Sequence, residues 1–409
     1  MNKRVLLGIT GGIAAYKIPM LVRLLVQKDL DVHVLMTRAA TEFVTPLTLA
    51  TLSGNPVSLD MWSKPCDPSI EHICLADHAD VAVIAPATAN VIGKLAAGIA
   101  DNMLTTVFTA VTCPVLLCPA MNVNMFKNPI VQMNLGKLRS VGYHVMQPES
   151  GDLACGYVGE GRLPEPERIA EYLDTLLSPK DLAGIKILVT AGPTEEPLDP
   201  VRFLTNRSSG KMGVAVARRA ALRGADVTLV AGPLKVPVPG GVRHVPIRTA
   251  KQMKDQALAL FPVTEVVIKA AAVADFRPVH ESSVKIKKID TETCIQLTEN
   301  DDILWAMGRT KKAGQILVGF AAETNDAILN GRSKLKAKNL DMLVLNDVTK
   351  IGAGFDCDTN IVRLLHRSGA EEELGIMSKE KVADIILDRV RDLREREATC
   401  AGGPSRDER

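Results

Sequence analysis

The sequence predicts an α/β protein with two Rossmann-like, doubly wound parallel-sheet domains in tandem. Its 409 residues exceed what one ordinary core holds and suit two domains. Hydrophobic residues make up 46% of the chain and aromatic residues only 3%, a balance typical of short aliphatic strands covered by helices on both faces. The two halves also repeat one order of strands, small-residue turns and helices, which is the strongest internal signal for the fold.

The repeated pattern is a strand, a turn, a helix and a second strand, followed by two more strands. In the first half the expected strands are 5–10, 32–36, 81–85 and 115–118, with a helix over 14–28. In the second half the expected strands are 186–190, 227–230, 266–270 and 316–318, with a helix over 213–224. Strands and helices that alternate at this spacing predict parallel sheets with right-handed crossovers.

The domain boundary is expected just after a helix that ends near Leu177. The predicted domains are residues 1–178 and 182–395, and the charged, Gly- and Pro-rich tail 396–409 is expected to be disordered. Segment 279–298 interrupts the helix–strand rhythm with a lysine-rich stretch. It is a candidate for pairing with another subunit.

Composition excludes several classes of function. The formal net charge of +2 and the few aromatic residues do not indicate a surface that binds nucleic acid. Eight scattered cysteines without a CxxC pair argue against a disulfide framework. Residues 5–15 loosely imitate a signal peptide but contain three glycines, and no apolar run reaches the roughly 18 residues of a membrane helix. We therefore expect a cytoplasmic protein that acts on small molecules and binds neither nucleic acid nor membrane.

The turn Gly11-Gly12 lies between a strand and a helix, where small residues let a phosphate approach. Its spacing is not GxGxxG, and a plain tight turn is the alternative. The acid that binds the ribose of NAD about 20 residues further on is missing, because Thr37-Arg38 and, in the second half, Ala231-Gly232 occupy that place. An NAD(P)-dependent dehydrogenase is therefore a rival interpretation that the sequence disfavours, with Arg38 leaving an opening for a phosphorylated dinucleotide.

Two lysine-containing patterns in the second half are candidates for phosphate binding. The run 208–211, Ser-Ser-Gly-Lys, resembles a P-loop but has Thr205 at the first glycine position and Met212 at the Ser/Thr position. Lys334 and Lys338 share one helix face, which is either solvated or holds a triphosphate. A simple helix cap is the alternative for the first pattern.

Three residues of the first half are candidates for catalysis. His72 lies in Glu-His-Ile near a loop, where a histidine is more often structural. Asn122 follows the fourth strand at the carboxyl edge of a parallel sheet, where open α/β proteins place their ligands. Cys155 lies in the glycine-rich loop 154–162, which would act as a mobile lid delivering a thiol proton. A buried, inert cysteine is the alternative.

Taken together, these motifs resemble the bifunctional phosphopantothenoylcysteine decarboxylase/phosphopantothenate–cysteine ligase family over about residues 3–394. The matching segments of the first half are GITGGIAAYK (8–17), EHI (71–73), APATAN (85–90), AAGIADN (96–102), PAMN (119–122) and ACGYVGEGR (154–162). Those of the second half are TAGPTEEPLDPVRFLTNRSSGKMG (190–213), AAVADF (271–276), KIKK (285–288), GFAAET (319–324) and KNLD (338–341). The first half also resembles flavin-dependent cysteine decarboxylases. Asn300-Asp301-Asp302 departs from the usual Asn-Pro-Asp, and Arg207 replaces a histidine of some members.

For the first half, the resemblance implies bound FMN. A flavin is needed because the carboxylate of cysteine has no neighbouring carbonyl to accept the electrons left by carbon dioxide, and oxidising the thiol to a thioaldehyde creates that acceptor. His72 would act at the thiol or as a base, Asn122 would hold the substrate carboxylate, and Cys155 would supply a proton. The implied FMN-binding residues are Gly11, Gly12, Thr37, Pro86, Thr88 and Asn90.

For the second half, the resemblance implies that CTP and Mg²⁺ activate 4′-phosphopantothenate as an acyl-cytidylate, which the amine of cysteine attacks. Asn206 matches a residue acting on that intermediate, and Lys285 joins the catalytic set. The lysines and Mg²⁺ would neutralise charge on the departing pyrophosphate. The implied CTP-binding residues are Asp275, Lys285, Phe320, Lys334 and Lys338. No metal ligand is predicted.

The predicted function is therefore two steps of coenzyme A biosynthesis, ligation followed by decarboxylation to 4′-phosphopantetheine. The resemblance also implies homo-oligomers, with trimers through the first half, dimers through the second, and the flavin at a subunit interface. A flavin-binding scaffold without catalysis is the second rival. The joint presence of His72, Asn122, Cys155 and Lys285 disfavours it, since a scaffold needs none of them.

Overall fold

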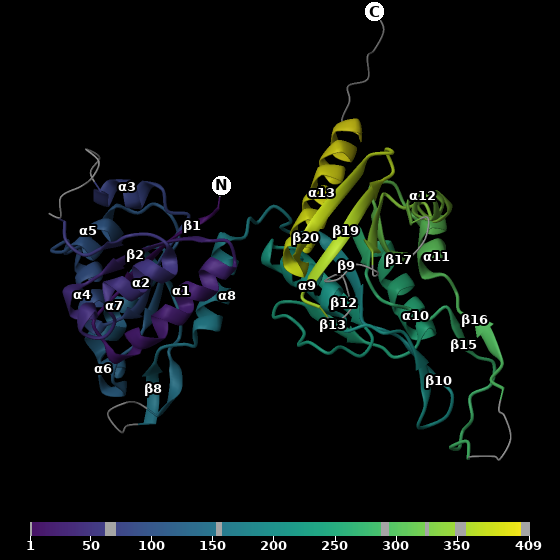
Figure 1. Cartoon of the computed structure of the whole chain (residues 1–409), viewed down its shortest axis with the longest axis horizontal. Helices are drawn as coiled ribbons and strands as arrows, with labels where there is room; N and C mark the ends of the chain where they lie inside the picture. Colours follow the sequence, from purple (N-terminus) through teal and green to yellow (C-terminus); the bar gives the residue numbers. More distant parts are fainter. Residues whose placement is uncertain are drawn as a thin grey trace, which may run out of the picture. The chain divides into compact units, whose positions relative to one another are not determined.

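The computed structural model describes residues 2–61, 71–152, 158–287, 294–323, 327–347 and 357–401. The chain forms two compact units, Met1–Ser178 and Pro179–Arg409. Each unit is built on a central sheet whose strands are mainly parallel, with helices on both faces (Figure 1). The predicted fold class, tandem Rossmann-like α/β domains, is confirmed.

The first unit holds a six-stranded parallel sheet in the order β3-β2-β1-β4-β5-β6. Its strands, with the separate hairpin β7–β8, are β1 (Arg4–Ile9), β2 (Asp31–Met36), β3 (Val57–Ser58), β4 (Val81–Ala87), β5 (Val115–Pro119), β6 (His144–Val145), β7 (Glu149–Asp152) and β8 (Val158–Arg162). Its α-helices are α1 (Ile18–Gln27), α2 (Pro46–Ser53), α3 (Glu71–Asp77), α4 (Ala89–Ala97), α5 (Met103–Ala110), α6 (Val123–Lys127), α7 (Pro129–Ser140) and α8 (Pro166–Leu177).

Alternation along the strands divides this core into two layers. On β1, Val5 and Leu7 face the layer covered by α1, α2 and α8, whereas Leu6 faces the layer covered by α4, α5 and α7. The helix expected over 14–28 instead starts as a 3₁₀ turn, Ile13–Lys17, and becomes α-helical at Ile18. Pro19 explains the difference, because proline fits the first turn of an α-helix but not its interior.

The second unit holds an eight-stranded sheet in the order β13-β12-β9-β14-β17-β18-β19-β20. Its strands, with the small pairs β10–β11 and β15–β16, are β9 (Lys186–Ala191), β10 (Glu195–Pro197), β11 (Phe203–Thr205), β12 (Asp226–Ala231), β13 (Arg243–Pro246), β14 (Val266–Lys269), β15 (Phe276–Pro278), β16 (Leu297–Glu299), β17 (Ile316–Glu323), β18 (Met342–Asp347), β19 (Thr359–His366) and β20 (Glu371–Ser378). Its α-helices are α9 (Lys211–Leu222), α10 (Ala250–Leu260), α11 (Ile303–Thr310), α12 (Ala327–Ala337) and α13 (Lys379–Ala401).

Helices α9 and α13 cover one face of this sheet and α10, α11 and α12 the other (Figure 1). The sequence pattern missed the two antiparallel strands β19 and β20 at the sheet edge, which are joined by a tight connection. Helix α13 also continues to Ala401, into the segment expected to be a disordered tail. Arginine, glutamate and alanine dominate there, and all three favour helix.

In both sheets the next strand along the chain lies on one side of the central strand, and a later strand lies on the other side. In the first unit β1 lies between β2 and β4, and in the second β9 lies between β12 and β14. The loops after β1 and β4, and after β9 and β14, therefore separate above the carboxyl ends of neighbouring strands. Crevices at such points are where open α/β sheets bind ligands. Among the described helices, none is both long and apolar enough to cross a membrane.

Candidate functional site

A buried threonine closes the base of the crevice in the first unit. Thr10 follows β1, and its hydroxyl donates to the carbonyl oxygen of Pro86 at 2.6 Å. The hydroxyl oxygen of Thr10 also accepts from the backbone N–H of Thr88 at 3.2 Å. The loops after β1 and β4 are therefore fixed to each other by one side chain that is only 1% exposed.

A cavity of about 600 Å³ opens above this threonine, within the usual range of small-molecule sites. Two ion pairs flank it, Arg38 with Asp60 at 2.9 Å and Lys94 with Asp101 at 2.6 Å. The cavity is lined by Thr10, Gly11, Thr37, Arg38, Ala39, Leu59, Asp60, Met61, Thr88, Ala89, Asn90, Val91, Lys94, Asp101, Asn102, Met103 and Met125.

Four of the six predicted FMN-binding residues line this cavity, namely Gly11, Thr37, Thr88 and Asn90. Pro86 contributes the carbonyl oxygen that Thr10 binds. Gly11 must be glycine for a steric reason, because a Cβ there would lie 2.5 Å from Cβ of Ala39. Gly12 is less confined, since its Cβ would meet Thr88 Cγ2 at an ordinary 3.7 Å.

Asn122 begins helix α6, on which Met125 lines the same cavity. Its Oδ1 accepts from the backbone N–H of Asn124 at 2.8 Å, so the side chain also caps the helix. Strand β8 packs directly on this loop, where Met121 N–H donates to the carbonyl oxygen of Gly161 at 2.9 Å. A Cβ at Gly161 would lie 2.2 Å from the Met121 oxygen, so only glycine permits this approach.

The remaining catalytic candidates of the first unit are less constrained. Cys155 lies in segment 153–157, outside the described residues, and only the flanking strands β7 and β8 are seen to pair antiparallel. His72 lies in the first turn of α3 and is part-exposed, and it is absent from the residues that line the cavity. Four of the flavin-binding candidates thus line the cavity, whereas neither Asn122 nor His72 is among the described residues that line it.

The second unit also has a buried threonine at its crevice, whose hydroxyl binds the loop after the neighbouring strand. Thr190, 1% exposed, lies in β9, and its hydroxyl accepts from Ala271 N–H at 3.3 Å in the loop after β14. The hydroxyl of Thr194 accepts from Ala274 N–H at 3.0 Å in the same loop. Asn206 then spans the crevice, because its Nδ2 donates to the carbonyl oxygen of Val273 at 2.9 Å. The predicted acyl-nucleotide residue is therefore fixed at the point where the strand order reverses.

The loop that resembles a P-loop serves close packing. Gly210 has a left-handed backbone conformation, φ 77°, at the start of α9. A Cβ at Gly213 would lie 2.6 Å from Cβ of Ala191, so glycine lets α9 pack against the end of β9. Lys211 pairs with Asp358 at 2.7 Å.

Lys285 is held in place by a carboxylate that the sequence analysis did not single out. The Asp199 side chain accepts from the backbone N–H groups of Val201 and Arg202 at 2.8 Å, and from that of Ile286 at 3.1 Å. Arg202 binds the same carboxylate and also donates to the carbonyl oxygen of Ile286 at 2.8 Å. The guanidinium of Arg202 holds the pKa of Asp199 far below its usual range. This Asp199–Arg202 clamp positions the exposed Lys285 next to Ile286.

The nucleotide-binding candidates gather at the carboxyl ends of β14 and β17. Asp302 caps helix α11 through Trp305 N–H at 3.0 Å and pairs with Lys338 Nζ at 2.7 Å. Burial opposes the charge of Asp302, but the hydrogen bonds from Lys338 and Trp305 outweigh it, and the pKa is lowered. Asp275 lies in the loop after β14, where its carbonyl oxygen accepts from Asn300 N–H at 2.8 Å.

The other two predicted CTP-binding residues lie on neighbouring elements. Phe320 is part-buried on β17, directly after Gly319, which pairs with Lys269 across the ladder. Lys334 lies on α12, one helical turn before Lys338. Asp275 and Lys338 therefore lie near one another at the end of β14, beside Asp302. Lys334 lies further back on α12, and Lys285 lies in the segment that the Asp199–Arg202 clamp anchors.

Lys269 is a second residue that the sequence analysis missed. It ends β14, between Thr190 of β9 and Gly319 of β17. Burial lowers its pKa to about 8, although the charge of Asp302 acts in the opposite direction. The only signal in the sequence is a lysine that ends the apolar run Val266–Ile268.

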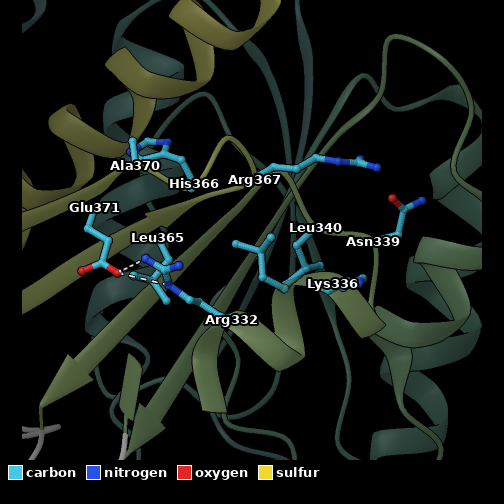
Figure 2. A pocket seen from close by; sticks show the side chains of 11 residues that line it. Arg332, Lys336, Asn339, Leu340, Leu365, His366, Arg367, Ala370 and Glu371 are labelled. Atoms are coloured by element: carbon cyan, nitrogen blue, oxygen red, sulfur yellow. Dashed lines mark hydrogen bonds and ion pairs between the residues drawn. The ribbon is translucent and has the colours of Figure 1, made fainter. Parts of the chain in front are cut away.

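A separate cavity of about 410 Å³ lies between α12 and the β19–β20 turn. Figure 2 shows Arg332 paired with Glu371 on one side, and Lys336 and Asn339 on the other. None of the predicted site residues lines this cavity. In the described ranges no cluster of three or more His, Cys, Asp or Glu side chains offers a metal cage.

The fold and these crevices define a two-domain α/β protein with a candidate ligand site at the carboxyl edge of each main sheet. The Flavoprotein family matches residues 1–178, and the family described as DNA/pantothenate metabolism flavoprotein C-terminal domain matches residues 182–393. The first unit is therefore a flavoprotein domain, and the second is the domain that accompanies it in pantothenate metabolism.

The chain is 47% identical over 393 residues to the coenzyme A biosynthesis bifunctional protein CoaBC of Bacillus subtilis (strain 168), with 95% of this chain and 97% of the relative covered. It is 43% identical over 388 residues to CoaBC of Vibrio cholerae, with 94% and 97% covered. A solved C-terminal domain of CoaBC is 39% identical, covering 53% of this chain and 98% of that domain with a TM-score of 0.46.

The chain belongs to the family of bifunctional coenzyme A biosynthesis proteins CoaBC. The predicted pair of activities, a decarboxylase and a ligase, is confirmed at the level of this family. The rival dehydrogenase and scaffold interpretations are not supported.

We expect the Asp199–Arg202 clamp to be needed for ligation alone. Asp199→Asn removes the charge that holds Arg202 and weakens the anchor of the Lys285 segment. Ligase kcat/KM should fall by about tenfold or more, because small misplacements of a reacting group are costly, while decarboxylation is unchanged. Steady-state assays of both half-reactions measure this, with the exposed Asp255→Asn in the same unit as the matched control. Unchanged ligation in Asp199→Asn would contradict the positioning role.

Proposed function

We propose that the first unit binds FMN in the 600 Å³ cavity and decarboxylates 4′-phosphopantothenoylcysteine. The observation that carries this proposal is the pair of hydrogen bonds of the Thr10 hydroxyl, which joins the loops after β1 and β4 beneath a cavity at the point where the strand order reverses. Two features of the cavity fit a flavin mononucleotide. Gly11 leaves room for close backbone approach, and Arg38 and Lys94 supply positive charge for a phosphate.

When bound, FMN supplies the reversible two-electron chemistry that lets the cysteine carboxylate leave as carbon dioxide. The residues of the chain bind and orient the substrate. The Asn122 amide would hold the substrate carboxylate, and helix α6, which Asn122 begins, contributes Met125 to the cavity lining. His72 and Cys155 are assigned to proton transfer at the thiol and at the product carbon. A trimer built through this unit would let a second subunit supply the side chains that one chain leaves outside the cavity.

We propose that the second unit joins cysteine to 4′-phosphopantothenate with CTP. The carboxylate of 4′-phosphopantothenate attacks the α-phosphorus of CTP and releases pyrophosphate, and the amine of cysteine then displaces CMP. Asn206 would hold the acyl-cytidylate, because its amide is already fixed across the crevice. Lys285, Lys334 and Lys338 supply positive charge for the phosphates. Mg²⁺ needs no protein cage here, since it commonly binds through nucleotide phosphates and one or two carboxylates.

The direct test supplies the purified protein with 4′-phosphopantothenate, cysteine, Mg²⁺ and either CTP or ATP. Mass spectrometry should find 4′-phosphopantetheine, with CTP preferred. In the Lys285→Gln variant we expect ligation to fall about 100-fold, because charge on the departing pyrophosphate is no longer neutralised. Decarboxylation of supplied 4′-phosphopantothenoylcysteine should be unchanged. Equal loss of both activities would refute two separable sites, and the absence of any product would refute the proposed reactions.

Gly11 provides a separate test of the flavin site. In Gly11→Ala the new Cβ would lie 2.5 Å from Ala39, which forces the turn out of the cavity. The purified variant should lose most of its yellow flavin absorbance and its decarboxylase activity, and it should keep ligation. Gly93→Ala is the matched control, since a Cβ there makes only one contact, at 3.7 Å. A Gly11→Ala protein with full flavin content would place the flavin elsewhere.

A further inference from the structure

Lys269 has an unusual position for a lysine. It occupies the carboxyl end of β14, and strand alternation places its side chain on the same face as Val267. That face is covered by α11, through Leu304 and Met307. A lysine that is part-buried beneath a helix loses some of its hydration, which costs free energy. Lysines in such positions are often found at functional sites.

The charged groups that face Lys269 belong to the proposed nucleotide site. They are Asp302 at the start of α11, Lys338 after α12, and Asp275 in the loop after β14. Both oxygens of the Asp302 carboxylate have other partners, since Oδ1 accepts from Trp305 N–H and Oδ2 from Lys338 Nζ. Within the ranges that the structure describes, no group accepts a hydrogen bond from Lys269 Nζ. The amine therefore has charge neighbours but no dedicated acceptor.

We propose that the ammonium group of Lys269 binds a phosphate oxygen of the nucleotide, and that nucleotide binding is coupled to proton uptake at this residue. The inference rests on the proposed CTP site and adds a binding residue to it. A polyphosphate supplies a hydrogen-bond acceptor for Lys269. The Asp302 carboxylate does not serve as one, because it already accepts from Lys338 Nζ and from the N–H of Trp305 in the first turn of α11. Charge-assisted hydrogen bonds of this kind are about twice as strong as neutral ones.

The direction of the proton coupling follows from the local charges. Burial lowers the pKa of Lys269 to about 8 in the free protein, and an adjacent phosphate raises it. Binding therefore takes up a proton when the pH lies above the free value and below the bound one. Nucleotide affinity is constant below the free pKa and falls as the pH rises through it. The nucleotide phosphates are already ionised at that pH, so they are not the source of the uptake.

The test is isothermal titration of the full-length protein with CTP and Mg²⁺, in two buffers of different ionisation enthalpy. Wild-type protein should take up a fraction of a proton per CTP just above pH 8 and much less at about pH 6.5. Lys269→Met should abolish that difference and weaken CTP binding by about tenfold or more, the loss of one charge-assisted hydrogen bond. Lys269→Arg should keep most of the affinity but show no uptake, because arginine stays protonated.

Lys336→Met is the matched control, since Lys336 lies on α12 at the separate cavity in Figure 2. It should match wild type in affinity and proton uptake. Wild-type affinity and uptake in Lys269→Met would overturn the role of Lys269 and leave the CTP site intact. If wild-type protein fails to bind CTP, the proposed nucleotide site fails with it. Should the methionine variant not fold, wild-type uptake that is equal at both pH values still overturns the inference.

Discussion

Both candidate sites depend on one interaction, a buried threonine hydroxyl that joins the loops after two neighbouring parallel strands. Gly8 pairs with Ile84, which sets Thr10 opposite Pro86, and Thr10 then accepts from the N–H of Thr88. Thr190 pairs with Lys269 and accepts from the N–H of Ala271. In each unit the donor lies two residues beyond the strand partner of the threonine. Without this hydroxyl, a buried N–H at the point where the loops separate would lack a partner, at a cost of about 1–3 kcal/mol.

The two units build different chemistry on the same junction. In the first, most of the residues that line the cavity are small or neutral, and the four charged ones are joined in two ion pairs. This suits a planar cofactor whose own chemistry is hard and whose protein contacts mainly orient it. In the second, the crevice is lined by charged groups, among them Lys338, Asp302 and Asp275. This suits a polyphosphate, for which catalysis is mainly positioning and neutralisation of charge.

The sequence predicted the features of the fold that depend on local residue patterns. Aliphatic runs and small-residue turns located the parallel strands and the residues that follow them, including Gly11 and Asn122, whereas Asn206 was predicted only from the family resemblance. It missed Asp199 and Lys269, because their roles arise from contacts between segments far apart in the chain. A lysine at the end of a strand ordinarily extends into solvent, and only the packing of α11 over this face of the sheet shows that Lys269 is part-buried. His72 matched a family motif, yet the motif could not show that this residue is not among those that line the cavity.

The pairing of Lys338 with Asp302 shows how a backbone contact far from the ligand sets the charges around it. Gly308 lies within α11, and a Cβ there would be 2.1 Å from the carbonyl oxygen of Lys338. Asn339, with its left-handed φ of 51°, donates to the Gly308 oxygen at 3.0 Å and fixes the same approach. The Lys338 backbone is thus held against the second half of α11, and its side chain must run along the helix to reach Asp302 at the first turn. Because the Asp302 carboxylate is occupied by Lys338 and by the N–H of Trp305, it does not serve as a hydrogen-bond acceptor for the neighbouring Lys269, whose ammonium group is left for a phosphate oxygen.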